Sequence, residues 1–347
     1  MKKTLAALIV TAFAASAANA AVVYDNEGTK VELNGSLRLI MEKADKKVYN
    51  AANQSTKKAN SALRNAGSRF GITVKHNLDN DFYALGRLEF RFDDTTSRDK
   101  FGRLYAKRAY VGLGSKATGD ITFGRQLTIA DDLSQAVDYE YGFIPKSEYI
   151  PTAGTGVVRY DYKGIEGLQL SANYNFGQTN DEKGNPLKPG IKNAYAVGAL
   201  YTVGDLDARL AYGHTNFETG ASYAHRLDGV LASLGYKFGD FTLTGDFGYG
   251  HEKLDDAKVN KFYVSPGFAY QVVPASKVYG NYLYERAKGE SDKVKTHGFL
   301  LGADYKLHKQ VVLFVEGKYV TTKEYVNDSY DGKVKDRAIG VGMRVSS

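Results

Sequence analysis

Cysteine and tryptophan are absent from this chain of 347 residues, and only 6 prolines occur in it. Without cysteine there are no disulfide bonds, which many exported proteins use, so the fold needs another source of stability. Beyond residue 20 no apolar run is long enough to cross a bilayer as a helix, which excludes a helical membrane protein. Glycine, tyrosine and phenylalanine are plentiful, at 37, 26 and 17 residues. This composition suits long strands joined by tight turns.

The first twenty residues are unlike the rest of the chain. Lys2-Lys3 precedes an apolar stretch at 5–15, and Ala18-Asn19-Ala20 supplies the small residues of a cleavage site. This order predicts a secretory signal peptide over residues 1–20, removed from a mature chain of 21–347. The loss of two lysines leaves 44 basic against 39 acidic residues, a formal charge of +5. Such a mild excess does not indicate nucleic acid binding, so we expect no nucleic acid partner.

Polar and apolar residues alternate along most of the mature chain, as side chains do on the two faces of a β-strand. Between 29 and 43, Leu37, Leu39 and Met41 share one face, and Ile40 is an apolar exception on the polar face. Sixteen segments show the pattern: 29–43, 69–78, 82–92, 104–113, 119–125, 157–163, 168–176, 195–201, 206–212, 230–238, 241–249, 262–272, 278–284, 299–307, 311–319 and 339–345.

The connections between these segments alternate between short turns and long polar loops. The long ones are 44–68, 93–103, 177–192, 216–226, 251–260, 285–295 and 322–332. An even number of strands of about ten residues, with short turns at one end and long loops at the other, is typical of outer-membrane barrels. A closed barrel also pairs every backbone group within the bilayer. We therefore predict an all-β fold, a 16-stranded antiparallel transmembrane β-barrel. The alternative, a soluble β-sandwich, would need a second sheet over each apolar face.

The alternation stops at 126–156, a stretch rich in acidic and aromatic residues. A break of this length inside a regular array is usually functional. We predict that this third long loop folds into the barrel and forms its constriction. The alternative is an ordinary exposed surface loop.

A barrel of sixteen strands leaves an aqueous channel, and charged residues can face inward only where water is present. Alternation places five arginines and one glutamate on the inward face: Arg38, Arg69, Arg87, Arg91, Arg108 and Glu89. For Arg38 and Arg91 the favoured interpretation is a solvated wall residue without a special role. Alternation places Arg125 on the outward face, with Ile121 and Phe123, but it lies at a strand end, where a bulge would turn its side chain inward. Charges that face acids across the lumen would set the selectivity of a pore.

The segment 103–126, RLYAKRAYVGLGSKATGDITFGRQ, resembles the trimeric general-diffusion porins of Gram-negative outer membranes. Its Gly-Asp-x-x-x-Gly-Arg-Gln block is fairly specific for that superfamily, and the hairpin VVRYDYKGIEGLQLSANYNFG adds to the likeness. Loop lengths and composition are most similar to the major porin of the Haemophilus and Pasteurella group. The resemblance implies a constriction in which wall residues face acids of the infolded loop. The matching positions are Arg69, Glu89, Arg108 and Arg125 on the wall, and Asp138 and Glu140 on the loop.

Two features depart from the family pattern. Tyr141-Gly142-Phe143 stands near the place of a Pro-Glu-Phe-Gly turn, and no arginine occupies the position of a third wall arginine before Val157. The resemblance also implies a homotrimer, in which the loop 93–103 reaches toward a neighbour. Its surroundings would be outer-membrane lipid and lipopolysaccharide.

The sequence therefore predicts a Gram-negative outer-membrane porin without cofactor, through which small hydrophilic solutes and ions diffuse passively. Three alternatives stay open. A substrate-specific channel would show a ladder of aromatic residues in the lumen, whereas most tyrosines here fall on the apolar face. A barrel lipase needs a Ser/His pair near the rim, and no convincing pair or other catalytic motif is present. An adhesin would act through its loops.

Overall fold

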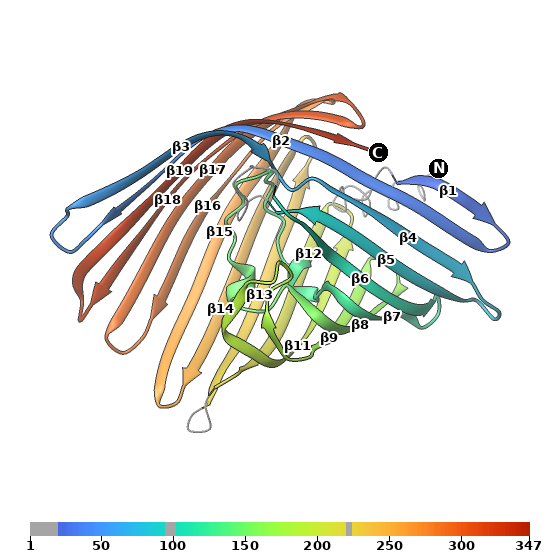
Figure 1. The fold of residues 1–347 in the computed structure, drawn as a ribbon, viewed down its shortest axis with the longest axis horizontal. Coiled ribbons are helices and arrows are strands. Elements are labelled where there is room, and N and C mark those ends of the chain that lie inside the picture. Colours follow the sequence, from blue (N-terminus) through green and yellow to red (C-terminus); the bar gives the residue numbers. More distant parts are fainter. Residues whose placement is uncertain (1–19, 94–101, 220–223) are drawn as a thin grey trace.

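The computed structural model describes residues 20–93, 102–219 and 224–347. The predicted signal peptide, except for Ala20, and most of the loop 93–103 lie outside these ranges. The chain forms one antiparallel sheet that closes on itself (Figure 1). Its strands are β1 (Ala21–Asn26), β2 (Thr29–Tyr49), β3 (Ser55–Asn65), β4 (Arg69–Asn77), β5 (Phe82–Phe92), β6 (Leu104–Ser115), β7 (Gly119–Leu127), β8 (Ala153–Ile165), β9 (Leu168–Asn175), β10 (Gln178–Asn180), β11 (Pro186–Val203), β12 (Leu206–Phe217), β13 (His225–Phe238), β14 (Phe241–Leu254), β15 (Ala257–Val273), β16 (Ser276–Lys288), β17 (Asp292–His308), β18 (Val311–Val326) and β19 (Ser329–Ser346).

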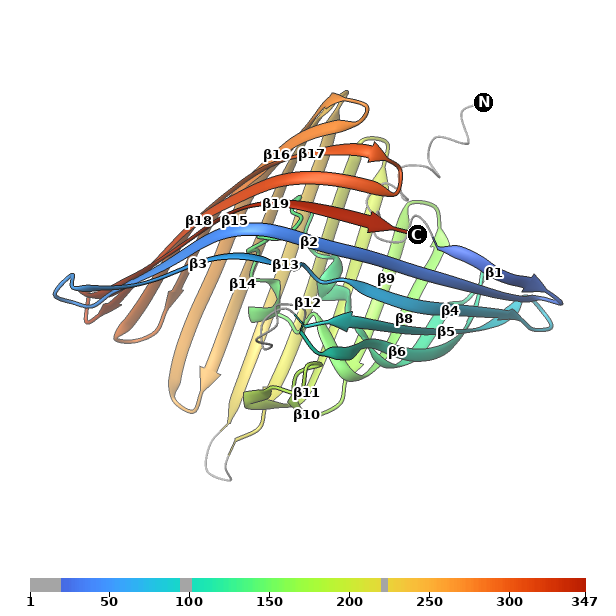
Figure 2. The same cartoon turned by 45° about the horizontal axis from the view of Figure 1, so that its top comes forward.

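These strands make a barrel of 16 positions, which confirms the predicted fold. Strands β3 and β4 follow one another along the same edge of β2 and share one position. Strands β19 and β1 share another along the opposite edge of β2, and β10 is a short strand within a connection. The pairing of β19 with β2, from Ser36↔Ser346 to Tyr49↔Lys333, closes the sheet (Figure 2). Within the described residues each of the 16 positions is paired on both sides, as a bilayer requires, while β1 and β3 themselves pair with β2 alone.

The apolar residues of the alternating segments face outward. Leu37 is 65% exposed and Leu301 is 60% exposed, which is the surface expected of a wall that contacts lipid. Among the described residues, no helix is long enough and apolar enough to span a bilayer.

Several of the predicted long polar loops are β-hairpins that prolong the barrel strands. The region 44–68 contains the end of β2 and all of β3, and β14 and β15 are joined by Asp255-Asp256 alone. At the β18–β19 turn, Asn327 and Asp328 adopt φ values of 48° and 61°, as a two-residue hairpin turn requires. The prediction was wrong here because a strand with water on both faces is polar on both faces and loses the alternation that marked the others.

Candidate functional site: a charged cavity beside the segment 128–152

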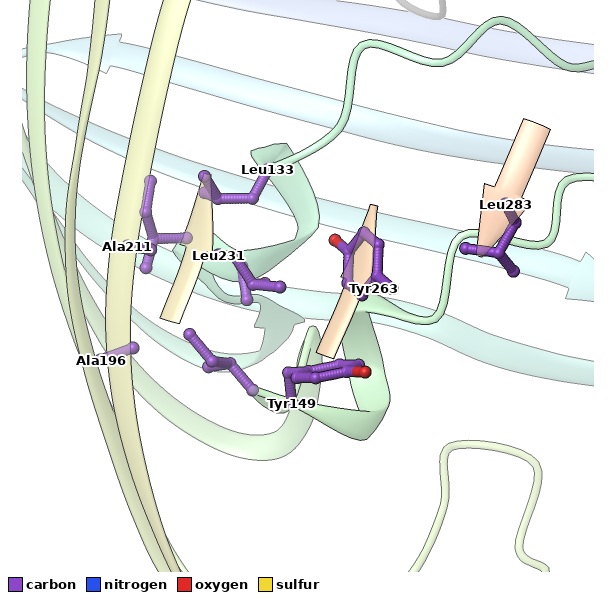
Figure 3. Close-up of a cluster of buried hydrophobic side chains, with 10 residues drawn as sticks. Leu133, Tyr149, Ala196, Ala211, Leu231, Tyr263 and Leu283 are labelled. Carbon is purple, nitrogen blue, oxygen red and sulfur yellow. The ribbon is translucent and has the colours of Figure 1, made fainter. Parts of the chain in front are cut away.

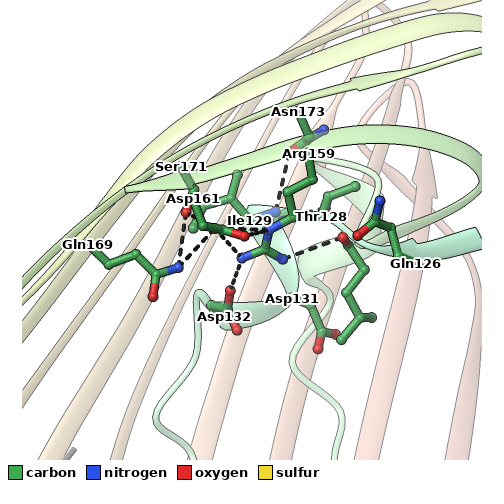
Figure 4. A network of polar contacts seen from close by, with 12 residues as sticks. Gln126, Thr128, Ile129, Asp131, Asp132, Arg159, Asp161, Gln169, Ser171 and Asn173 are labelled. Carbon is green, nitrogen blue, oxygen red and sulfur yellow. Dashed lines mark hydrogen bonds and ion pairs between the residues drawn. The ribbon is translucent and has the colours of Figure 1, made fainter. Parts of the chain in front are cut away.

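Residues 128–152 leave the sheet between β7 and β8 and include two short 3-10 helices, η1 (Ile129–Asp132) and η2 (Lys146–Glu148). The segment begins at a polar network on β8 and β9 (Figure 4). Arg159 of β8 binds Asp132 through Nη2 at 3.0 Å and Asp161 through Nε at 2.9 Å. The Thr128 side chain accepts a hydrogen bond from the backbone of Ala130 and so caps η1. These contacts fix where the segment departs from the wall.

An apolar cluster attaches the segment to the opposite wall (Figure 3). Its members on the segment are Ile129, Ala130, Leu133, Tyr149 and Ile150, and those on the wall are Ala196, Ala211, Leu231, Tyr263 and Leu283. All ten are at most 2% exposed. The wall residues come from β11, β12, β13, β15 and β16. The segment therefore packs like a protein core against this part of the barrel.

Glycines of the wall make room for this packing. Gly213, Gly229 and Gly250 lie directly opposite one another on β12, β13 and β14. A Cβ atom on Gly229 would come 2.2 Å from the carbonyl oxygen of Tyr149, and one on Gly213 would come 2.6 Å from Ile150. Any side chain at these two positions would push the segment away from the wall.

The middle of the segment is held by one buried carboxylate, that of Glu316 on β18, which is 0% exposed. It accepts backbone hydrogen bonds from Tyr139 at 2.7 Å, from Glu140 at 2.8 Å and from Tyr141 at 2.5 Å. The hydroxyl of Tyr279 donates a fourth at 2.8 Å. Charged acceptors make the stronger hydrogen bonds, so Glu316 is the main polar anchor of this part of the segment.

The predicted wall residues Arg69, Arg87, Glu89 and Arg108 lie on three neighbouring strands. Glu89 is buried and accepts from Arg87 Nη2 at 2.7 Å and from Arg91 Nε at 2.6 Å. The register places Glu89 opposite Arg108 and Arg69 opposite Arg91. The structure thus brings these four predicted residues together around one acid.

Arg38 of β2 and Arg344 of β19 extend this group. They lie opposite one another in the register, and both interact electrostatically with Arg69. We call Arg38, Arg69, Arg87, Arg91, Arg108 and Arg344 the arginine cluster. So many cations around a single buried carboxylate give this side of the barrel a positive potential.

The predicted acids and Arg125 are placed elsewhere. Glu140 forms an ion pair with Arg64 Nη1 at 2.7 Å, and Arg64 also binds Glu42. Asp138 has an exposed side chain and interacts with Arg344, not with Arg69 or Arg108. Arg125 lies at a bulge of β7, opposite outward-facing Ala109, and donates to backbone carbonyls of Ala106 and Glu182. The nearest cations to these two acids are thus Arg64 and Arg344, and a position facing Arg69 and Arg108 across the lumen stays a prediction.

A cavity of about 670 Å³ opens beside the arginine cluster. Arg91, Lys107 and Arg108 line one side of it, and Asp131 and Glu148 of the segment 128–152 line another. Asp131 interacts electrostatically with both Lys107 and Arg108. Side chains of opposite charge thus border one space. Among the described residues, no cluster of acidic and histidine side chains could hold a metal ion.

Sequence reasoning missed four residues of this site. Arg344 and Arg159 alternate with outward-facing Met343 and Tyr160, so the rule that identified Arg69 could have found both. Arg64 lies in a region expected to be a loop. Lys107 lies at a bulge between β5 and β6, where Arg108 and Ala106 pair with consecutive residues, so alternation alone misplaced it.

Comparisons with known proteins agree with this structure. The family model described as Gram-negative porin matches residues 4–325. A major outer membrane protein of Pasteurella multocida is 30% identical, with 99% of each chain covered. OmpT of Vibrio cholerae has the same fold, with a TM-score of 0.70 and 18% identity over 94% of this chain and 99% of that one. An anion-selective porin from Comamonas acidovorans has a TM-score of 0.64 and 17% identity, with 92% of this chain and 100% of that chain covered.

The closed barrel and its charged interior accord with an outer-membrane channel for diffusion rather than with an enzyme. The family match over most of the chain and the likeness to the Pasteurella protein over its whole length show that this chain belongs to the Gram-negative porin family and lies in the outer membrane.

Proposed function

We propose that this porin lets small hydrophilic solutes and ions diffuse passively through a lumen narrowed by the segment 128–152. The observation that carries this proposal is the cavity in which Arg91, Lys107 and Arg108 face Asp131 and Glu148. The apolar cluster and Glu316 would hold the segment in place on the other side. The constriction acid opposite Arg108 is then Asp131, in place of the expected Asp138 and Glu140.

Single-channel recording in a planar bilayer tests the proposal. Purified protein should give stable ohmic steps, with a reversal potential in a salt gradient that depends on the charges lining the cavity. Folded protein that conducts nothing would contradict it.

We also propose that three copies of the chain assemble. The outward faces of β2 and β6 carry apolar residues and suit subunit contact: Leu37 is 65% and Val111 is 64% exposed. A solved Vibrio cholerae OmpT with 18% identity is described as a trimer form. Channel closures in groups of three equal steps would support the assembly, and single independent closures would count against it.

Selectivity should depend on pH through Asp138. Although its side chain is exposed, desolvation by the surrounding protein and the nearby Glu316 carboxylate raise the pKa of Asp138 to about 6, against the opposing effect of Arg344 and Lys146. A raised pKa means that the carboxylate is charged above about pH 6 and neutral below it. Lowering the pH from about 7.5 to about 5 should therefore shift permeability toward anions, by up to about threefold for one charge at roughly 6 Å in water. The reversal potential measures the shift, and Asp138→Asn should remove most of it; an equal shift in that variant would refute the assignment.

We propose that lipopolysaccharide contacts a row of cations on the outer wall. Arg286, Lys295, Lys323 and Lys333 lie directly opposite one another on β16, β17, β18 and β19. Lys295 lies on the same face of β17 as outward-facing Phe299, so the four side chains of the row point outward. Among the described residues, none of the four forms an ion pair with an acidic side chain, although Arg286 interacts electrostatically with Asp328. Like charges in direct opposition destabilise a sheet, so phosphate groups of a glycolipid would relieve this repulsion.

Replacing Lys295, Lys323 and Lys333 by glutamine should weaken binding of bisphosphorylated lipid A about 100-fold, since each lysine contributes roughly 1 kcal/mol at an anionic surface. Titration calorimetry in detergent measures this affinity. The control replaces Lys116, Lys163 and Lys237, three exposed lysines elsewhere on the chain, by glutamine. Lipid A without phosphates should bind weakly to every variant. Equal affinity of the row variant and the control variant for bisphosphorylated lipid A would contradict the site.

A further inference from the structure

Residues 177–192, which contain β10 and the beginning of β11, form a small hairpin that lies across the rims of neighbouring strands. Strand β10 pairs with the beginning of β11, through Gln178↔Ile191 and Asn180↔Pro186. The side chain of Gln178 also accepts a hydrogen bond of 2.9 Å from the backbone of Thr155 on β8. We call residues 177–192 the strap.

The tip of the strap is a preformed turn. The carboxylate of Asp181 accepts from the backbone N–H of Lys183 at 2.9 Å and from that of Asn185 at 2.8 Å. The Asn185 side chain donates to the same carboxylate at 2.9 Å. A turn fixed in this way presents Glu182 and Lys183 in a defined direction.

Both of these side chains bind the rim beyond β8. Glu182 forms an ion pair with Lys107 of β6, and Lys183 binds Asp93, directly after β5, at 2.8 Å. The backbone carbonyl of Glu182 accepts a hydrogen bond from Arg125 of β7 at 3.3 Å. Contacts with β6, β7 and the end of β5 thus hold the strap tip.

The strap is also part of the charged cavity. Gln178, Asp181 and Glu182 line the same space as Arg108 and Asp131. Lys107, which pairs with Glu182, lies within electrostatic range of Arg91 and Arg108. Glu182 therefore neutralises one cation of the positive side of the cavity while it holds the strap in place.

We propose that residues 177–192 form a strap latched over this cavity, and that Glu182, through its ion pair with Lys107, limits the preference of the channel for anions. This inference rests on the proposed function. Without Glu182, Lys107 would add an uncompensated charge beside the arginine cluster, and small anions would pass more readily. Because the two charges cancel, neutralising both should leave selectivity near that of the unmodified protein.

Reversal potentials in KCl gradients test the coupling. Glu182→Gln should raise the anion-to-cation permeability ratio about threefold at low salt, and Lys107→Gln should lower it by a similar factor. The double variant should return close to the unmodified value. These shifts should fade at about 1 M salt, where the screening length falls to roughly 3 Å. The control is Glu218→Gln, which removes an acid beside the strap that does not line the cavity with Arg108.

Amide hydrogen exchange of residues 177–192 gives a readout that does not need conduction. Both single variants should exchange at least about tenfold faster at the strap tip than the unmodified protein and Glu218→Gln. Unchanged exchange in Glu182→Gln would overturn the latch. An unmodified reversal potential in that variant, or a double variant that keeps the full shift of one single variant, would overturn the role in selectivity. Absence of conductance from the unmodified protein would instead refute the proposed function, while the exchange experiment still decides the latch.

Discussion

Replacing Glu316 by alanine is expected to release the middle of the segment 128–152 and to raise single-channel conductance. The substitution leaves the backbone N–H groups of Tyr139, Glu140 and Tyr141 without their shared acceptor. Loss of hydrogen bonds to a charged group costs about 1.5–3 kcal/mol each. Even a total of roughly 3 kcal/mol would change the ratio of attached to released segment about 100-fold.

The measurement is the conductance of folded protein, together with the largest neutral polymer that enters the pore. Folding is checked by the electrophoretic shift of unheated protein, since the substitution empties a buried site. Glu324→Gln is the matched control, because Glu324 is an exposed acid near the end of the same strand. Glu316→Gln keeps one oxygen acceptor and should fall between the two. A folded Glu316→Ala variant with unmodified conductance and exclusion limit would show that the apolar cluster alone holds the segment.

Replacing Gly229 by valine should displace the other half of the segment. Its Cβ atom would come 2.2 Å from the carbonyl oxygen of Tyr149 and 3.0 Å from Ile150, and a backbone atom cannot move aside as a flexible side chain can. Overpacking of this kind costs typically about 1–3 kcal/mol. Moving the segment away relieves the clash at the expense of the cluster that includes Leu231. We expect larger and noisier conductance steps and weaker ion selectivity.

The control for Gly229→Val is Gly245→Val on the adjacent strand β14, where an added Cβ would meet nothing within 4 Å. Gly245 lies opposite outward-facing Leu234, so this control adds the same side chain to the same sheet on the face away from the segment. Gly229→Ala should give an intermediate phenotype. Equal conductance and selectivity in the two valine variants would contradict the packing described for Tyr149 and Ile150.

The barrel was predictable from sequence because lipid imposes a strict alternation. Residues such as Leu37 and Leu301 had to face outward, and the inward direction of Arg69 and Arg108 followed from the same rule. The rule fails at bulges, where one extra residue reverses the direction of a side chain. The bulge between β5 and β6 is set by the pairing of two strands, and nothing in either strand alone marks it. Lys107 was missed for this reason.

The alternation of polar and apolar residues does not predict which wall residues the segment 128–152 contacts. The sequence nevertheless contained a signal for these contacts. Ile40 was an apolar exception on a polar face, and in the structure it is 1% exposed and belongs to the buried cluster with Tyr141. Phe314 and Leu231 are inward-facing apolar residues of the same kind. Such exceptions mark where the wall is dry because another part of the chain covers it. The partner of each carboxylate, Glu140 with Arg64 or Glu316 with the backbone, depended on distances that no spacing in the sequence encodes.

The closing pair of the barrel also constrains how the chain can fold. Strand β2 must find β19, which lies almost a whole chain length away, and Gly35 and Ser347, 312 residues apart, are joined by a hydrogen bond. Contacts between such distant residues form slowly, because a large loop must close before they contribute any stability. Until then β2 and β19 each present an unpaired, apolar edge that could join to another chain. An open sheet with unpaired edges thus precedes the closed pore. If β2 and β19 pair faster than these edges pair with other chains, the chain forms a channel, and otherwise it aggregates.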